Sequence, residues 1–339
     1  MPGFTEFLQR EMLENKTDEP AAILGGGGEE FETARASVSK CPLPSIGVVS
    51  FGGPDAMAFI NAQFTSNCAE VTPSRGQFSG WCDPKGRVLF LITIFSDGER
   101  LYALLPKIQI EEFIARLQRY ILRADVKLEN LTESVSVFGI SGDIQTEPYD
   151  TTGLTKPWDA TESSGRTMII RYGPGVPRFL MVGPEASAPQ RWAELDRAAV
   201  SENAWFALNI VSGLPHLDER TSGQFLPQNL NLDALGALSF SKGCYPGQEI
   251  VARLKYRGKV KKRLFPAICE SASVPRPGDR ILMPDDDRGV GHILCAQRLD
   301  SASSVVNMVA EIDIAAGELI VEGAAGTALR LIDLPYAVD

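Results

Sequence analysis

Apolar residues recur along most of this chain with the spacings of short strands and of amphipathic helices. In residues 108–121 they fall at Ile110, Phe113, Ile114, Leu117 and Ile121, the period of an amphipathic helix. Short apolar runs bounded by turn residues predict strands instead. We expect such strands at 45–50, 88–95, 101–105, 125–128, 134–140, 167–172 and 179–182.

Turn and capping residues add further elements to this pattern. Cys82 to Gly86 reads as a turn that precedes the strand at 88–95. Ser201 is suited to cap the start of a helix, because a serine hydroxyl accepts a hydrogen bond from a backbone N–H of the first turn. Gly213 marks the end of that helix, because glycine tolerates the left-handed conformation that commonly follows the last helical turn. We expect helices at 55–63, 189–200 and 202–212.

The pattern changes beyond Phe265. Short strands separated by turns such as Pro277-Gly278-Asp279 replace the mixed pattern, which is typical of a small barrel or sandwich. We therefore predict an α+β body over residues 41–265, with an inserted subdomain, and a C-terminal β-barrel over 266–339. Residues 1–40 are polar and contain the run Gly25–Gly28, which predicts a flexible segment.

Composition indicates an ordinary globular protein. Hydrophobic residues make up 44% and charged residues 22%, and the longest apolar run, Val88–Phe95, is too short to span a bilayer. The acidic start lacks an apolar signal segment, so we expect a cytoplasmic protein with no membrane partner. Six cysteines without a Cys-x-x-Cys pair predict reduced thiols. A net charge of −10 argues against broad, nonspecific nucleic-acid binding.

The stretch Ser-Lys-Gly-Cys-Tyr-Pro-Gly-Gln-Glu at 241–249 carries the clearest candidate chemistry. Cys244 lies in a tight glycine-rich turn close to Lys242, and a nearby cation makes a thiol more nucleophilic. Gln248 and Glu249 follow the turn and are able to hydrogen-bond a polar ligand. The alternative is a structural turn in which the cysteine is a small buried filler.

These nine residues resemble the signature of the YgfZ folate-binding proteins, which are related to the glycine-cleavage T-protein, a tetrahydrofolate-dependent aminomethyltransferase. Other stretches are similar to YgfZ as well: Tyr120–Val126, Cys82–Arg87, Trp205–Gly213, Ser222–Pro227, Ala252–Gly258 and Leu334–Tyr336. The resemblance covers most of residues 41–339. It implies a T-protein-like folate-binding fold for the α+β body and the C-terminal β-barrel.

The resemblance also implies a ligand, tetrahydrofolate or a derivative. Trp205 matches a tryptophan that contacts folate in these proteins, although a core position on its helix is the alternative. The second folate tryptophan falls on Ile46, which offers apolar contact without a ring. With the loop residues, the predicted folate site comprises Trp205, Ile46, Lys242, Tyr245, Gln248, Glu249 and Arg253, and Cys244 is the functional thiol.

In the T-protein an acidic pair follows a Gly-Gly turn, and an aspartate there is catalytic. The corresponding positions here are Phe90 and Leu91, so no carboxylate is available to manage the proton in aminomethyl transfer. The resemblance then implies an accessory protein that supports iron–sulfur cluster assembly or repair and iron–sulfur-dependent tRNA modification. Its partners would be iron–sulfur enzymes or assembly factors, and direct tRNA contact is the less favoured option. A folate-dependent aminomethyltransferase is the alternative function.

A run of cations follows the thiol loop. Seven lie within residues 253–263 without an acid among them, and they read either as a pair of solvated strands or as an anion site for the folate glutamate tail. RNA phosphates are a weaker third option. Only two histidines exist, His216 and His292, and they lack metal-ligand spacing, so we predict no metal site and a solvated His216.

Overall fold

The computed structural model describes residues 4, 7, 8, 28–145, 148–283, 286–313, 319–322 and 328–338. The predicted Gly25–Gly28 linker therefore lies outside these residues except for Gly28. The described chain divides into two units, each assembled from separate segments. Unit 1 comprises residues 1–59, 69–77 and 93–205, and unit 2 comprises residues 60–68, 78–92 and 206–339. Mixed helix and sheet content confirms the α+β class.

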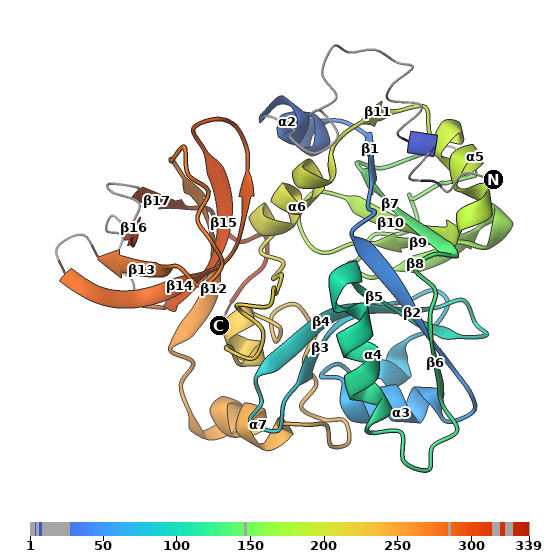
Figure 1. Cartoon of the computed structure of the whole chain (residues 1–339), viewed down its shortest axis with the longest axis horizontal. Helices are drawn as coiled ribbons and strands as arrows, with labels where there is room; N and C mark the ends of the chain where they lie inside the picture. Colours follow the sequence, from blue (N-terminus) through green and yellow to red (C-terminus); the bar gives the residue numbers. More distant parts are fainter. Residues whose placement is uncertain are drawn as a thin grey trace. The chain divides into compact units, whose positions relative to one another are not determined.

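Unit 1 contains a six-stranded sheet in the order β11-β1-β7-β10-β9-β8 (Figure 1). Its pairs are antiparallel apart from the short parallel pair of β1 with β11. The strands are β1 (Ser39–Pro42), β7 (Val135–Ser141), β8 (Ala160–Ser163), β9 (Thr167–Arg171), β10 (Arg178–Pro184) and β11 (Ala198–Ala199).

The core of this sheet is aromatic. Phe138, Phe179 and Met181 pack with Trp192 of helix α5 (Ala188–Glu194), and the ring of Phe4 joins them. Helix α5 ends sooner than the predicted 189–200, because the chain turns into β11. The adjoining 3-10 turns are η4 (Ser164–Arg166) and η5 (Glu185–Ser187).

Helix α2 (Gly28–Ala36) and strand β1 lie inside the segment that the sequence predicts to be flexible up to residue 40. Phe31 and Ala34 of α2 are buried, and so is Cys41 of β1. Residues 28–36 and 39–40 thus belong to regular elements rather than to a linker, because the mainly polar stretch contains two buried apolar residues that pack its helix.

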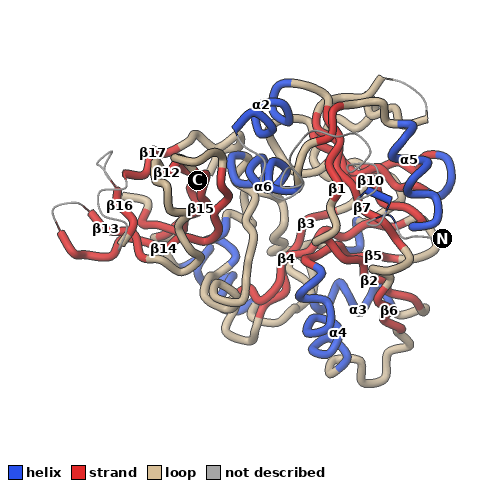
Figure 2. Tube along the Cα trace, turned by 45° about the horizontal axis from the view of Figure 1, so that its top comes forward, coloured by secondary structure: helices blue, strands red, loops and turns tan. Residues whose placement is uncertain are grey.

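A second sheet has the order β3-β4-β5-β2-β6; four of its strands lie close to predicted ones, whereas β3 was not predicted. Its strands are β2 (Ile46–Gly52), β3 (Gln77–Cys82), β4 (Val88–Ser96), β5 (Leu101–Pro106) and β6 (Lys127–Asn130). Helix α4 (Ile110–Gln118) packs against β2 and β6 through the predicted apolar face (Figure 2). The remaining elements are α3 (Ala56–Gln63), η2 (Cys68–Glu70) and η3 (Lys107–Gln109).

Unit 2 contains a closed barrel in the strand order β12-β15-β14-β13-β16-β17, which confirms the predicted C-terminal β-barrel (Figure 1). Its interior holds aliphatic side chains and Cys269. The strands are β12 (Lys262–Cys269), β13 (Arg280–Met283), β14 (Asp286–Arg298), β15 (Ser304–Glu311), β16 (Leu319–Val321) and β17 (Ala328–Leu331). The first strand begins four residues before the predicted boundary.

Helix α6 (Glu202–Val211) is bounded as predicted. The Ser201 hydroxyl accepts a hydrogen bond from the Ala204 backbone N–H at 3.4 Å, and Gly213 adopts a left-handed φ of 65° just beyond its end. Unit 2 also contains η6 (Pro227–Leu230) and helix α7 (Gln248–Arg257). No helix in the described part of the chain is long and apolar enough to cross a membrane.

Candidate functional site

The candidate residues fall into two groups, one in each unit. Lys242, Cys244, Tyr245 and the start of α7 belong to unit 2, whereas Trp205 and Ile46 belong to unit 1.

The Cys244 loop is a sharp turn that leads directly into α7. Gly247 adopts a φ of 79°, and a Cβ there would collide with the backbone of Gly86 in the preceding turn of unit 2. Only glycine satisfies both the left-handed conformation and this close approach. On the other side of the thiol, Gly243 faces open space. The loop therefore anchors its C-terminal end and presents Cys244 outward.

Cys244 is exposed, whereas Cys41, Cys68, Cys82, Cys269 and Cys295 are all buried. Burial disfavours a charged thiolate. It raises the pKa of Cys68 to about 11 and that of Cys295 to about 12, and it raises the pKa of the other three as well. Since the thiolate is the reactive form, nucleophilic thiol chemistry in the described structure is favoured at Cys244 alone.

Lys242 has a role that the sequence did not suggest. Its ammonium group donates hydrogen bonds to the backbone carbonyl of Asn61 in the last turn of α3, at 2.6 Å, and to that of Phe64 just beyond the helix. It also lies 5.0 Å from the centre of the Tyr245 ring. The thiol with which it interacts electrostatically is the buried Cys68. Lys242 thus fastens the loop to the end of α3, where carbonyl groups attract a cation.

Burial lowers the pKa of Lys242 to about 8 from 10.5, which gives a testable pH dependence. Between these two values the unfolded chain binds more protons than the folded one, so this group makes stability rise with pH. We expect the difference in unfolding free energy, wild type minus Lys242→Met, to increase as the pH rises from about 8 to 10.5. Urea denaturation at several pH values measures the gain. A difference that stays constant with pH would contradict the assignment.

The other loop residues divide into buried and exposed positions. Tyr245 is buried, burial raises its pKa, and its hydroxyl has no hydrogen-bond partner among the described residues. The Gln248 side-chain amide donates a long hydrogen bond, 3.5 Å, to the Lys242 carbonyl. Glu249 and Arg253 are exposed. The structure thus brings Lys242, Tyr245 and Gln248 together, with Glu249 and Arg253 on the helix that follows.

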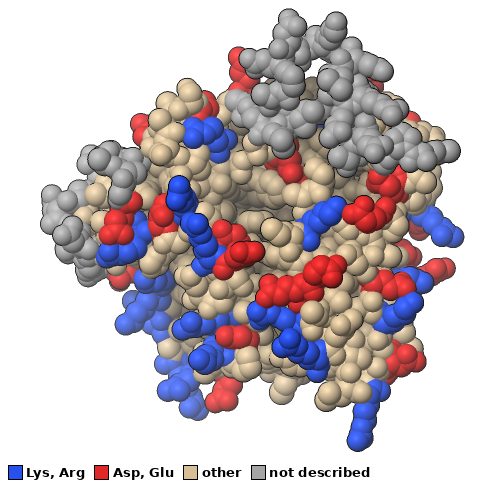
Figure 3. Space-filling view, in the orientation of Figure 1, with Lys and Arg blue, Asp and Glu red and all other residues tan. Residues whose placement is uncertain are grey.

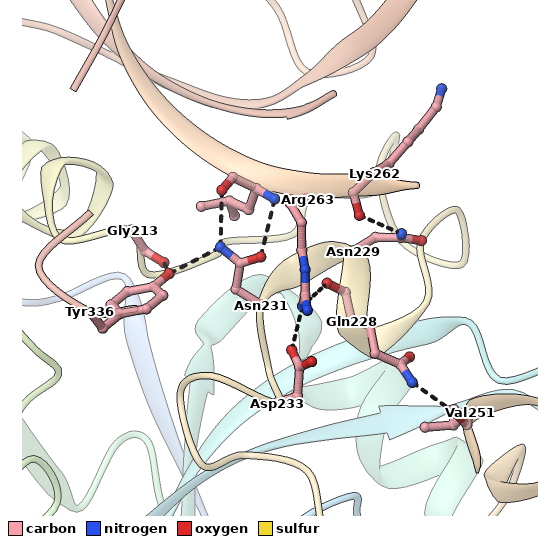
Figure 4. Close-up of polar contacts among 10 residues, drawn as sticks. Gly213, Gln228, Asn229, Asn231, Asp233, Val251, Lys262, Arg263 and Tyr336 are labelled. Carbon is pink, nitrogen blue, oxygen red and sulfur yellow. Dashed lines mark hydrogen bonds and ion pairs between the residues drawn. The ribbon is translucent and has the colours of Figure 1, made fainter. Parts of the chain in front are cut away.

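A polar network positions α7 within unit 2 (Figure 4). The Gln228 amide in η6 donates to the Val251 carbonyl in α7 at 2.8 Å. The same residue's carbonyl accepts a hydrogen bond from the Arg263 guanidinium at 2.9 Å, and that guanidinium also pairs with Asp233 at 2.6 Å. Helix α7 is therefore held to η6 and, through Arg263, to the first strand of the barrel.

Asn231 completes this network (Figure 4). It is fully buried in a left-handed conformation, and its side-chain amide donates to the Leu264 carbonyl at 3.0 Å and accepts from the Leu264 N–H at 3.3 Å. The Tyr336 hydroxyl accepts from the same amide and donates to the Gly213 carbonyl at 2.7 Å. The end of the chain, the turn after α6 and strand β12 are thereby joined.

Trp205 is only 1% exposed and lies on α6 against the six-stranded sheet. Its ring packs so closely on Gly139 that a Cβ there would come within 2.5 Å. Tyr172 stacks on it at 5.8 Å between ring centres, and the buried Arg178 guanidinium lies 5.4 Å away. Burial lowers the pKa of Arg178 to about 10. The indole N–H of Trp205 has no hydrogen-bond partner among the described residues.

Sequence reasoning missed Tyr172 and Arg178, since their relation to Trp205 arises only from the pairing of β9 and β10 with the sheet. Ile46, the other predicted contact in unit 1, is half-buried at the start of β2. Its neighbour Ser45 donates a hydrogen bond at 2.6 Å to Glu202, one turn before Trp205 on α6. The backbone N–H of Ser45 donates to the same carboxylate at 3.1 Å, so two hydrogen bonds link the neighbourhoods of Ile46 and Trp205.

Two readings of polar residues need correction. The cations at 253–257 lie on a helix rather than on a strand, and Arg263, only 4% exposed, is part of the structural network. His216 is half-buried rather than solvated, its ring lies 5.7 Å from that of Phe206, and burial lowers its pKa. No cluster of three metal-ligating side chains occurs within the described residues.

Phe90 and Leu91, the positions at which the sequence resemblance implies the missing acidic pair, are both buried. The Phe90 ring stacks on Trp81 at 5.6 Å, and Leu91 is buried in the same strand. The sequence of β4 contains no carboxylate.

These features define a class. The fold is that of the glycine-cleavage aminomethyltransferase: the crystal structure of aminomethyltransferase T from Bartonella henselae superimposes with a TM-score of 0.70 at 14% identity, over 93% of this chain and 90% of that one. The GCVT N-terminal domain family matches residues 18–144.

Within this class, the similarity is to YgfZ. The tRNA-modifying proteins YgfZ of Escherichia coli O7:K1 (strain IAI39 / ExPEC) and of Escherichia coli (strain SMS-3-5 / SECEC) are each 28% identical over 313 residues, which cover 91% of this chain and 96% of theirs. The resemblance predicted from the sequence, to YgfZ and to the T-protein, is confirmed.

Proposed function

We propose that this protein is a folate-binding accessory protein for tRNA modification, and that it acts through iron–sulfur enzymes. The observation that carries the proposal is the exposed Cys244 in its anchored turn, on a chain similar along nearly all its length to proteins named for tRNA modification. An exposed thiol held at a fixed position suits contact with a partner or a reactive group.

A folate ligand is supported by buried polar atoms that lack a protein partner. The Trp205 indole N–H and the Tyr245 hydroxyl are both of this kind among the described residues. A buried donor without a partner costs free energy, which a bound ligand with acceptor groups would recover. The Trp205 ring itself is packed against Gly139 and Tyr172, so the contact that we propose for the ligand is with the indole N–H rather than with the face of the ring.

The alternative is a folate-dependent aminomethyltransferase, which the fold alone favours. Such a reaction needs a group that positions the folate nitrogen and takes up its proton. Phe90 and Leu91 cannot do so, because they present no titratable group. Their packing against Trp81 and the strand core leaves the accessory role better supported.

A strain that lacks this gene distinguishes the two functions. The accessory role predicts reduced thiolation of tRNA and weak iron–sulfur enzyme activity, both restored by the wild-type gene. The transferase role predicts a defect in glycine cleavage with normal tRNA. A deletion strain with normal tRNA thiolation would overturn the proposal.

The Trp205 N–H can be tested separately from the packing of its ring. Trp205→Phe keeps an aromatic ring against Gly139 and removes a donor that has no described protein partner. We expect tetrahydrofolate to bind about fivefold more weakly by calorimetry, since one hydrogen bond contributes about 1 kcal/mol. Trp192→Phe, in the core of the same unit, is the matched control and should leave the affinity unchanged. Equal affinities in both variants and the wild type would remove Trp205 from the site.

A further inference from the structure

The exposed face of α7 carries cations and apolar side chains side by side. Arg253 and Arg257 lie one turn apart, and Ile250 and Tyr256 flank them at helical spacing. Ile250 is 40% exposed and Tyr256 is 67% exposed, so both apolar side chains are accessible beside the arginines. We call this face, together with the two segments described next, the α7 surface.

Two flanking segments extend the positive charge. The Asp83–Arg87 turn packs directly against the start of α7, because Gly86 lies against Gly247, and it exposes Lys85 and Arg87. The segment from Gly258 to Lys261 exposes Lys259 and Lys261 on the way into β12. Figure 3 shows the Lys and Arg side chains gathered over α7 and this segment, at the lower left of the molecule.

These cations are not neutralised within the described structure. No ion pair joins Lys85, Arg87, Arg253, Lys255, Arg257, Lys259 or Lys261 to a described acid, although the chain as a whole carries a net charge of −10. Glu249 is the exposed acid on α7. A local excess of unpaired cations on an acidic protein attracts an anionic partner to that place.

The aromatic part of the surface is held in position. The Tyr256 ring packs edge-on against Phe240 at 6.2 Å, and the Lys255 ammonium lies 3.9 Å from the centre of the Phe240 ring. Tyr256 is thereby fixed while most of its area stays accessible. A fixed aromatic ring next to cations is the arrangement on which unpaired bases stack while their phosphates are neutralised.

We propose that the α7 surface binds an unpaired segment of RNA, with its phosphates at Arg253, Arg257 and the flanking lysines and a base on Tyr256. The inference deepens the proposed function and rests on it for the choice of RNA as the biological partner. The carboxylates of an acidic peptide or of folate polyglutamate would pair with the cations of the α7 surface, but they would make no use of the Tyr256 ring. An RNA base can stack on that ring, so its presence favours RNA as the ligand.

The test measures fluorescence anisotropy of a labelled single-stranded RNA of about 12 nucleotides against the full chain over a series of salt concentrations. We expect Arg253→Ser/Arg257→Ser to weaken binding at least about fivefold and to reduce the salt slope by about 0.7 for each cation removed. Tyr256→Ala should weaken binding about fivefold or more, and Tyr256→Phe should not. Arg276→Ser/Arg330→Ser, exposed cations elsewhere in unit 2, is the matched control and should bind like the wild type.

A labelled oligoglutamate of the same length is the second probe. Binding of oligoglutamate as tight as that of RNA, with no effect of Tyr256→Ala on either, would replace RNA by an acidic peptide or polyglutamate and overturn the inference. Equal RNA affinity of the α7 variants and the control would also overturn it. If the wild type restores tRNA thiolation in the deletion strain but binds no RNA, the inference fails and the proposed function stands. If it binds RNA but restores nothing, the proposed function fails instead.

Discussion

Replacing Cys244 with alanine is expected to abolish restoration of tRNA thiolation while leaving the protein folded. The side chain is exposed on a turn whose anchors are glycines and Lys242, so its removal creates no cavity and breaks no contact of the core among the described residues. The loss would therefore report the chemistry of the thiol and not the stability of the fold. The measurement is complementation of a deletion strain, with thermal denaturation of the purified variant beside it.

The five buried cysteines provide the control for this prediction. Cys68→Ala and Cys269→Ala remove thiols that the fold encloses, and both should restore tRNA thiolation provided that they fold. Alkylation of the native protein followed by mass spectrometry should modify Cys244 first, since burial keeps the other thiols protonated and inaccessible. Full rescue by Cys244→Ala would show that the motif is a structural turn.

Arg263→Met is expected to have the largest effect on stability, about 2 to 4 kcal/mol of unfolding free energy. The substitution removes one partner of a buried ion pair, and it removes one of two donors to the Gln228 carbonyl, which still accepts a hydrogen bond from the Asn231 N–H. The lower part of that range allows for Asp233, whose side chain is 25% exposed and regains some water. Chemical denaturation gives the value.

Lys262→Met is the matched control, because it changes the adjacent cation on the same strand. Only the backbone carbonyl of Lys262 takes part in the network, so the loss of its ammonium should change stability by less than about 0.5 kcal/mol. Similar losses in the two variants would show that general charge on β12, rather than the Arg263 network, stabilises this region.

Local pattern predicted much of the fold because strands and amphipathic helices are local features. Strands β2, β4 and β5 and helix α4 lie within a few residues of their predicted places. Helix α7 was not predicted because it buries little apolar surface: Val251 is its fully buried residue. Cations occupy many of its other positions, so the sequence shows no apolar repeat with a helical period. Its position depends on contacts with Gln228 and Gly86, which no local pattern reveals.

The candidate site divides in the same way. The sequence identified Cys244 from its flanking glycines, and the structure places it on the surface. The sequence alone did not indicate that the Lys242 ammonium donates hydrogen bonds to the carbonyl groups of Asn61 and Phe64, some 180 residues earlier in the chain. Such long-range partners depend on how distant segments pair, and spacing along the chain carries no information about them.

The division of unit 2 among three chain segments has a consequence for its synthesis. Residues 60–68 and 78–92, the latter with the stacked Trp81 and Phe90, leave the ribosome well before the third segment of their unit begins at Phe206. At about 5 to 20 residues per second, the intervening stretch of roughly 110 residues delays their partners by about 6 to 22 s. During translation we therefore expect those side chains of residues 60–68 and 78–92 that pack against residues 206–339 to stay uncovered until the third segment has been made.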